Sequence, residues 1–369
     1  MLVREIHIYG VRNLEQVKLK LHPGINVFVG ANGSGKTSLL EGVYFLALGR
    51  SFRTSRLNNL ISFYNDFASV SAIYSDKSCN KQIKISSVKY KNQEKTSKIG
   101  ETKAERSDVA TLTPTQIIHE GSSKLIFNEP DGRRKFLDWL VFYSHKDYQH
   151  LWREFNRALQ QRNNILKKSG PNFVGMLSNL DKVFVSLSEK IKLARQDVWR
   201  KFENVWVESF NNLGLNLLVK PQIKLFSGWN GDLLELLAEN RNIDQRMGFT
   251  GCGPHRADLQ FIVQGKAAKD VLSRGQGKAL SLAMILARSR FIKMTAERDD
   301  LVSVLLIDDL CAELDDVNAD KIIRCLFDWQ NDLQVFITGV DQNRLKNVLP
   351  KERCKWFKVS EGAIVEMEV

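Results

Sequence analysis

The sequence of 369 residues lacks any long hydrophobic run, although 43% of its residues are hydrophobic. No stretch approaches the roughly 18 uninterrupted apolar residues that a membrane helix requires. Arg4 and Glu5 stand where a secretory signal peptide would carry its apolar segment. These observations argue against a membrane-spanning or secreted protein, and we expect a globular protein of the cytoplasm.

Cysteine and histidine are also scarce, with five and six residues, and the cysteines show no C-x-x-C spacing. This pattern argues against a disulfide framework or a structural zinc site and fits a reducing compartment. No Ser/His/Asp or Cys/His set has the pattern of a nucleophilic catalytic group. We expect any chemistry to come from other residue types.

Positive charge is in excess, because 54 Lys and Arg against 42 Asp and Glu give a net charge of +12. Such a balance favours a polyanionic partner. Half of the excess lies between residues 77 and 106, where nine Lys and Arg stand against three Glu. Two interpretations remain open for this stretch: lysines that protect a sheet edge from aggregation, or a surface that faces phosphates.

The chain length predicts two or three folding units, at roughly 150 residues each. Strands are expected up to residue 29, and again between residues 67 and 100. From Arg133 to Gly214, apolar residues at spacings of three and four predict long helices, whose buried face includes Trp199 and Trp206. Later strands at 303–307 and 333–338, flanked by helices, indicate an α/β fold.

The strongest motif is the phosphate-binding pattern G-x-x-x-x-G-K-[ST], which lies between the expected strand 25–29 and the expected helix 37–48. Its glycines let backbone N–H groups face an anion, and the helix N-terminus adds positive dipole character. The lysine is predicted to reach the β- and γ-phosphates of ATP, and the threonine hydroxyl to ligate Mg²⁺. The predicted ATP-binding residues are Gly30, Ala31, Asn32, Gly33, Ser34, Gly35, Lys36 and Thr37.

An acidic pair follows the strand 304–307, as a P-loop ATPase requires. Asp308 is predicted to hold Mg²⁺ together with Thr37, and Asp309 is predicted to be the catalytic base that polarises the attacking water. Taken alone, the two acids would be more typical of a solvated strand end than of a metal site. Their combination with the P-loop favours the metal and catalytic roles.

The segment 272–276 reads L-S-x-G-Q and precedes an apolar helix. Its exposed helix N-terminus is suited to phosphate binding, although alone it could be a helix start capped by Ser273. Its place after the P-loop and before the acidic strand is the order found in ABC-type ATPases, which use this motif in trans. The residues predicted to contact the γ-phosphate of a second subunit are Ser273, Arg274, Gly275 and Gln276, and Asp315 is the predicted D-loop residue.

About 235 residues separate the two phosphate motifs, and the helical segment lies between them. This arrangement is similar to SMC-type proteins, whose head is split by an inserted arm. Over nearly its whole length the sequence resembles the RecF family of that group. The resemblance is also carried by four further stretches, at 49–53, 133–138, 161–163 and 253–258.

The resemblance implies an ABC-type, SMC-like P-loop ATPase head, with its parts at residues 1–128 and 245–369 and a helical lobe at 129–244. It implies a homodimer that forms on ATP and binds duplex DNA, gapped DNA and single-strand/duplex junctions. With RecR and RecO, such proteins help to load recombinase onto single-stranded DNA in DNA repair, replication restart and the SOS response to DNA damage. The ATPase is implied to be slow, DNA-stimulated and used as a switch.

Several positions stay open or depart from ABC ATPases in general. Asp309 stands where many of them have Glu, and Thr338 where many have a switch histidine, and both fit slow turnover. Gln116 is a guess for the Q-loop. Arg50, Arg53 and Arg56 would either face DNA phosphates or solvate a loop. His255 and Arg256 would either shape a turn or contact a nucleotide or a second subunit.

Two other functions remain as alternatives. A transporter ATPase subunit would have a much shorter interval between the two phosphate motifs. A nucleotide-gated scaffold would bind protein partners and hydrolyse ATP at a negligible rate.

Overall fold

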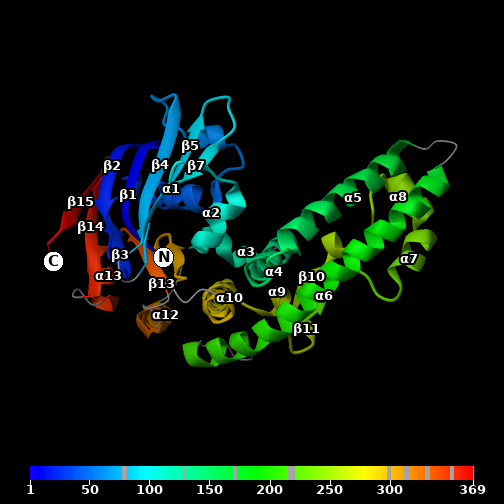
Figure 1. The fold of residues 1–369 in the computed structure, drawn as a ribbon. Coiled ribbons are helices and arrows are strands. Elements are labelled where there is room, and N and C mark those ends of the chain that lie inside the picture. Colours follow the sequence, from blue (N-terminus) through cyan, green and yellow to red (C-terminus); the bar gives the residue numbers. More distant parts are fainter. Residues whose placement is uncertain are drawn as a thin grey trace. The chain divides into compact units, whose positions relative to one another are not determined.

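The computed structural model describes residues 1–76, 81–127, 130–168, 173–214, 221–296, 301–310, 316–328, 333–349 and 353–368 (Figure 1). The chain forms two compact units. The first unit comprises residues 1–122, 209–216 and 282–369, and the second comprises 123–208 and 217–281. Within the described ranges, no helix is long and apolar enough to cross a membrane.

The first unit contains a mixed sheet in the order β15-β14-β3-β13-β12-β8. Its strands are β3 (Ile25–Val29), β8 (Thr115–Ile118), β12 (Ser303–Ile307), β13 (Leu333–Gly339), β14 (Cys354–Ser360) and β15 (Ala363–Met367). All but the β14–β15 pair are parallel, and every residue of β3, β12 and β13 is buried. Because parallel strands end at one edge of a sheet, the residues that follow β3 and β12 are brought close together.

A second, antiparallel sheet of the same unit has the order β2-β1-β4-β5-β6-β7. Its strands are β1 (Leu2–Val11), β2 (Leu14–Lys20), β4 (Phe67–Ser75), β5 (Gln82–Tyr90), β6 (Thr96–Ile99) and β7 (Thr102–Lys103). Helix α1 (Lys36–Leu48) packs against strands of both sheets. Its apolar residues point in all directions and nearly all are buried, as expected of a helix covered on every side.

The remaining helices of the first unit are short or shared with the second. They are η1 (Leu57–Leu60), α2 (Arg106–Leu112), η2 (Glu120–Ser123), α12 (Asp316–Asp328) and α13 (Gln342–Val348). Helix α10 (Arg274–Thr295) begins in the second unit and ends in the first.

The second unit is mainly helical, as its apolar spacing predicts. Its elements are α3 (Lys124–Phe127), α4 (Pro130–Ser144), α5 (Tyr148–Lys168), α6 (Phe173–Leu213), β9 (Gln222–Phe226), α7 (Leu233–Glu239), α8 (Arg241–Met247), η3 (Pro254–Arg256), β10 (Asp258–Val263), β11 (Lys266–Ala267) and α9 (Ala268–Val271). Trp199 and Trp206 are buried in it, so their place in the expected apolar face is confirmed. Strand β10 pairs with β9, and residues 245–281 belong to the second unit. The expected domain boundary lies between residues 244 and 245, whereas this unit continues to residue 281.

Residues of the stretches 133–138, 161–163 and 253–258 form ion pairs within the second unit. Arg162 is completely buried and donates to Asp181 at 2.8 Å and to Asp244 at 2.7 Å. Arg133 forms a two-point contact with Asp258, at 2.6 and 3.2 Å. Removing one member of such a pair leaves an uncompensated buried charge, which is strongly destabilising. The stretches 133–138, 161–163 and 253–258 therefore hold this unit together.

Candidate nucleotide-binding site

The P-loop connects the end of β3 to the start of α1, as its motif predicts. Gly33 and Gly35 adopt φ values of 78° and 119°, which other residue types rarely tolerate. A Cβ on Gly30 would lie 2.1 Å from the carbonyl oxygen of Val359 in β14. The loop therefore needs glycine at these positions for its backbone path, independently of any ligand.

The side chain of Lys36 folds back over the loop. Its Nζ donates to the carbonyl oxygens of Gly30 and Ala31, both at 2.8 Å. Burial lowers the pKa of Lys36, and the negative charges of Asp309 and Asp308 oppose that shift. The lysine thus lies between the loop and the acidic pair, where an anion bound by the loop would meet a positive charge.

The predicted metal ligands are in direct contact although 271 residues separate them. The Thr37 hydroxyl donates to the Asp308 carboxylate, with oxygen distances of 3.0 and 3.1 Å. Asp308 stands directly after β12, and its backbone N–H donates to Ile118 of β8 at 2.8 Å. The parallel sheet therefore brings the hydroxyl and the carboxylate together, as the sequence predicts.

Thr338 of β13 connects both acids. Its hydroxyl donates to Asp308 Oδ1 and accepts the backbone N–H of Asp309, each at 2.8 Å. Asp309 has a φ of 51°, a left-handed conformation that costs a residue other than glycine free energy. Thr338 stabilises this conformation, a role that its position in a buried apolar strand does not reveal in the sequence.

Two contacts that the motifs do not reveal support the P-loop from outside. Asn13, in the β1–β2 turn, donates to the Gly33 carbonyl at 3.1 Å and accepts from the Ser38 hydroxyl at 2.7 Å. The backbone N–H of Gly362, in the β14–β15 turn, donates to the Ser34 carbonyl at 2.8 Å. The only sequence signal for these partners is that each lies in a turn between two strands, which does not identify its target.

The L-S-x-G-Q segment forms a helix start with reciprocal capping. Ser273 Oγ accepts the backbone N–H of Gln276 at 3.2 Å, and Gln276 Oε1 accepts the backbone N–H of Ser273 at 3.0 Å, which is a capping box. Ser273, Arg274 and Gly275 are exposed. A Cβ on Gly275 would meet no atom within 4 Å, so packing within the chain does not require glycine there.

Several other predicted residues have partners within the fold. Arg53 lies 3.8 Å from the buried carboxylate of Glu41, and Arg50 lies over the ring of Tyr44. Arg56 is exposed and makes no ion pair or ring contact with any residue that the structure describes. The side chain of Gln116 is buried between Ser289 and Arg288, at 2.6 and 2.7 Å. The Gln116 side chain therefore points to α10, and its position does not support Gln116 as the Q-loop glutamine.

His255 and Arg256 pack within the second unit. The His255 ring lies against Phe155 and Phe184, and its Nε2 lies 2.9 Å from the Thr250 carbonyl. The Arg256 guanidinium lies over the ring of Phe249. These contacts favour the turn-shaping interpretation over a nucleotide contact.

Acid is expected to destabilise the second unit through His255. Burial lowers its pKa from 6.5 to about 4, so the folded protein resists protonation that the unfolded chain accepts. The contribution of neutral His255 to the free energy of unfolding is therefore fully present above pH 6.5 and is lost as the pH falls towards 4. Between pH 7 and pH 5 the wild type should lose about 2 kcal/mol more than His255→Gln, measured by urea unfolding. Equal losses would show that His255 does not titrate in this way.

The predicted D-loop residue, Asp315, lies outside the described residues. In the part of the chain that the structure describes, no group of three or more His, Cys, Asp or Glu could hold a metal ion. A Mg²⁺ site needs no such group, because this ion usually keeps several waters and uses few protein ligands. Thr37 and Asp308 fit that requirement.

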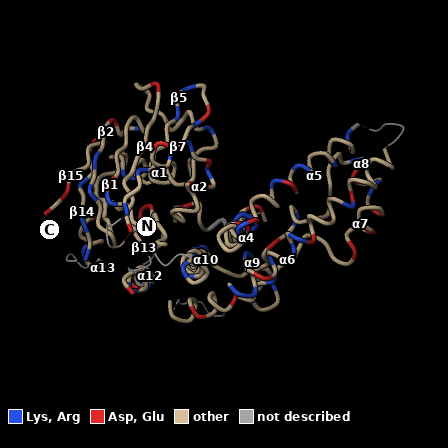
Figure 2. The backbone as a smooth tube through the Cα atoms, in the orientation of Figure 1, with Lys and Arg blue, Asp and Glu red and all other residues tan. Residues whose placement is uncertain are grey.

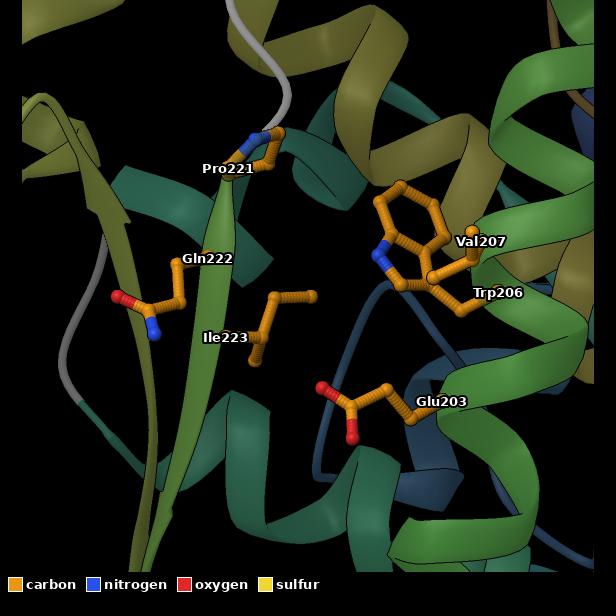
Figure 3. Close-up of a pocket in the computed structure, with 6 residues that line it drawn as sticks. All are labelled: Glu203, Trp206, Val207, Pro221, Gln222 and Ile223. Carbon is orange, nitrogen blue, oxygen red and sulfur yellow. The ribbon is translucent and has the colours of Figure 1, made fainter.

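The second unit has a separate pocket of about 290 Å³. Figure 3 shows Glu203, Trp206 and Val207 of α6 on one side and Pro221, Gln222 and Ile223, at and next to the start of β9, on the other. Its lining has no cation, and the Glu203 carboxylate would repel a phosphate. This pocket is therefore unsuited to a nucleotide phosphate group.

Comparison with known proteins identifies the family of the chain. The family model described as the RecF/RecN/SMC N terminal domain matches residues 2–364. The chain is 34% identical over 360 residues to the DNA replication and repair protein RecF of Pseudoalteromonas translucida, covering 96% of each chain. It is 32% identical to the protein of that name from Shewanella woodyi, covering 100% of this chain and 99% of the relative.

The fold is shared with solved structures. The recombination mediator protein RecF-ATP in the RecFOR pathway superposes with a TM-score of 0.84 at 23% identity, covering 100% of this chain and 98% of the other. An Smc head bound to the C-winged helix domain of ScpA gives a TM-score of 0.60 at 17% identity, covering 100% and 98%. These comparisons define an SMC-like ABC-type ATPase head, so the predicted fold class is confirmed. The chain belongs to the RecF family.

Proposed function

We propose that this protein is a recombination mediator that binds ATP and DNA and acts in DNA replication and repair. The observation that carries the proposal is the contact between Thr37 and Asp308, which joins the P-loop to the acidic strand. The RecF relatives are named for replication and repair, and the similar solved structure is named as an ATP-bound mediator.

The P-loop residues fit an ATP triphosphate. The hydroxyl of Ser34 is buried without a hydrogen-bond partner in the described structure, and a Cβ at Gly33 would meet open space. Buried polar groups normally have partners, so the Ser34 hydroxyl is suited to donate a hydrogen bond to a phosphate oxygen of a bound ligand. Lys36 would bind the β- and γ-phosphates, and the backbone N–H groups at the start of α1 would face them.

Thr37 and Asp308 would hold Mg²⁺. When bound, the ion would neutralise charge on the phosphate oxygens. Asp309 would orient water and accept its proton as the general base. Its left-handed backbone fixes the direction of this short side chain, and Thr338 holds the backbone in place. Slow turnover, used as a switch, follows from a base that is shorter than glutamate.

The hydroxyl of Thr338 offers a direct test of this arrangement. Thr338→Val removes two hydrogen bonds of about 1 kcal/mol each. We expect turnover to fall about tenfold or more, and half-maximal ATP binding to need more Mg²⁺. Thr338→Ser keeps the hydroxyl and should remain close to the wild type. Equal behaviour of the valine and serine variants would contradict the role of the hydroxyl.

Two copies of the chain would complete each site. Ser273, Arg274, Gly275 and Gln276 of one copy would face the γ-phosphate held by the P-loop of the other. Asp315 stays the proposed D-loop residue. The exposed helix start and the open space at Gly275 support this assignment. ATP would thereby hold the homodimer together.

The dimer would bind duplex DNA, gapped DNA and single-strand/duplex junctions. It would help RecR and RecO to load recombinase onto single strands in the cytoplasm, with roles in replication restart and SOS induction. The net charge of +12 supports a DNA partner. Arg56 would contact DNA phosphates, whereas Arg50 and Arg53 have the internal partners described above.

Affinity for a gapped duplex at fixed salt, measured with ATP, with ADP and without nucleotide, tests this function. Tighter binding with ATP alone is expected. Equal affinity in all three states would contradict nucleotide-controlled DNA binding. Turnover measured with and without DNA distinguishes a working ATPase from a scaffold that merely binds nucleotide.

A further inference from the structure

The antiparallel sheet of the first unit has one face without a covering element among the described residues. Ile8 and Val70 point to α1, since both lie within 4 Å of a Cβ placed on Gly42. Side chains alternate between the two sides of a strand, so His7 and Ser71 point to the opposite side. We call this side the outer face, and its residues are partly or fully exposed.

The outer face is basic. One cross-strand row runs from Lys18 through His7, Ser71 and Ser86 to Lys98, and Lys103 of β7 pairs with Lys98. Lys20 and Lys84 lie in the next row. Figure 2 shows Lys and Arg positions along β5, and all five lysines named here are exposed.

Few acids balance these lysines. Among the described strand residues, Glu5 is the one acid of the outer face, and it pairs with Lys18 and His7. No ion pair with a described carboxylate is recorded for Lys20, Lys84, Lys98 or Lys103. The middle of the face carries small side chains, Ser69, Ser71 and Ser86, which leave a flat surface between the lysines.

Aromatic rings gather at one end of this face. The Phe67 ring lies 5.0 Å from that of Tyr9 and 5.2 Å from that of Tyr90, centre to centre. Phe63 and Tyr64, in the loop before β4, are 89% and 86% exposed. Two large apolar side chains so fully in water contribute nothing to the core, and they suggest contact with a partner.

We propose that the outer face binds single-stranded DNA, with its lysines on the phosphates and Phe63 and Tyr64 stacked on bases. The proposal rests on the proposed DNA-binding function and adds the surface and the residues that would contact the single strand. A basic surface with exposed aromatic rings is the combination that single-strand-binding proteins use. Duplex DNA hides its base faces, so the aromatic rings would gain nothing from it.

The first experiment removes charge. Lys84→Gln, Lys98→Gln and Lys103→Gln are combined in the full chain, and Lys190→Gln, Lys224→Gln and Lys266→Gln form the matched control in the second unit. The probe is a labelled oligo(dT) of 30 nucleotides. The outer-face variant should bind at least about tenfold more weakly, and its logarithmic salt slope should fall by about 2, at roughly 0.7 per lost contact. The control should match the wild type.

The second experiment removes the exposed rings. The double variant Phe63→Ser, Tyr64→Ser should bind oligo(dT) about tenfold or more weakly and a blunt duplex of equal length almost as the wild type does. Because both side chains are exposed, folding should be unaffected, and unchanged ATP affinity would check this.

The outcomes separate the two proposals. If either outer-face variant binds oligo(dT) as tightly as the control, the surface is wrong, and contact with a protein partner becomes the better explanation of the exposed rings. If the ring variant loses equal affinity for duplex, the single-strand assignment is wrong. Nucleotide-controlled binding of gapped DNA would survive both results, whereas a wild type that binds no DNA would overturn the proposed function as well.

Discussion

Lys36→Ala is expected to lower ATP affinity by at least about 100-fold. The side chain is 7% exposed and lies between the P-loop carbonyls and the acidic pair. Its ammonium group would make charge-assisted hydrogen bonds to phosphate, each worth about 1.5–3 kcal/mol. Two such bonds correspond to a factor of about 100 or more. Binding of a fluorescent ATP analogue, followed by titration, measures this directly.

The lysine should matter for binding far more than for folding. Among the described residues, the hydrogen bonds of Lys36 Nζ go to backbone oxygens of its own loop. The fold therefore loses no long-range hydrogen bond, and the acidic pair loses only the attraction of a nearby positive charge. Lys346→Ala, at a partly exposed lysine of α13 in the same unit, is the matched control and should bind ATP normally. A Lys36→Ala protein that binds ATP within a few-fold of the wild type would contradict the role of the P-loop in ATP binding.

Ser273→Arg is expected to abolish dimerisation on ATP while leaving ATP binding by the single chain within about twofold. The new side chain would occupy the exposed helix start at which the second copy's γ-phosphate is proposed to bind. It would also remove the capping hydroxyl, at a cost of about 1 kcal/mol. That cost is too small to unfold a chain of this size.

Light scattering with and without ATP measures the effect. The wild type should change from 42.2 kDa to about twice that mass, and the variant should stay monomeric. Ser178→Arg, on α6 of the same unit, controls for an added arginine and should dimerise. A dimeric Ser273→Arg protein would contradict the composite site.

Much of the nucleotide site follows from the sequence because it depends on local patterns. A buried strand, a glycine-rich turn and a helix start predict the P-loop, and a second buried strand ending in Asp308 predicts the metal ligand. Parallel pairing then brings Thr37 and Asp308 together without further information, since both strands end at the same edge.

Other features depend on contacts that no local pattern specifies. Gln116 is a polar residue in a short strand, and only packing against Ser289 and Arg288, about 170 residues away, shows that its side chain is occupied. The limits of the second unit depend on the pairing of β9 with β10. The hydroxyl of Thr338 acquires its role from two neighbours on an adjacent strand.

The helical segment also has a feature that its sequence pattern does not predict. Its apolar spacing predicts long helices from Arg133 to Gly214. One long helix is present in α6, with 41 residues. The segment before it is divided into α4 and α5, with 15 and 21 residues. The break at residues 145–147 does not interrupt the apolar pattern strongly enough to be visible in the sequence.

Mixing two defective variants tests the shared site most directly. A Lys36→Ala chain keeps its signature, and a Ser273→Arg chain keeps its P-loop, so a mixed pair contains one intact composite site. When the two chains carry donor and acceptor dyes, we expect ATP-dependent energy transfer in the mixture. The transfer should be weaker than for labelled wild type and absent from either variant alone. A mixture that stays monomeric at ATP and protein concentrations that fully dimerise the wild type would contradict a site built from two copies.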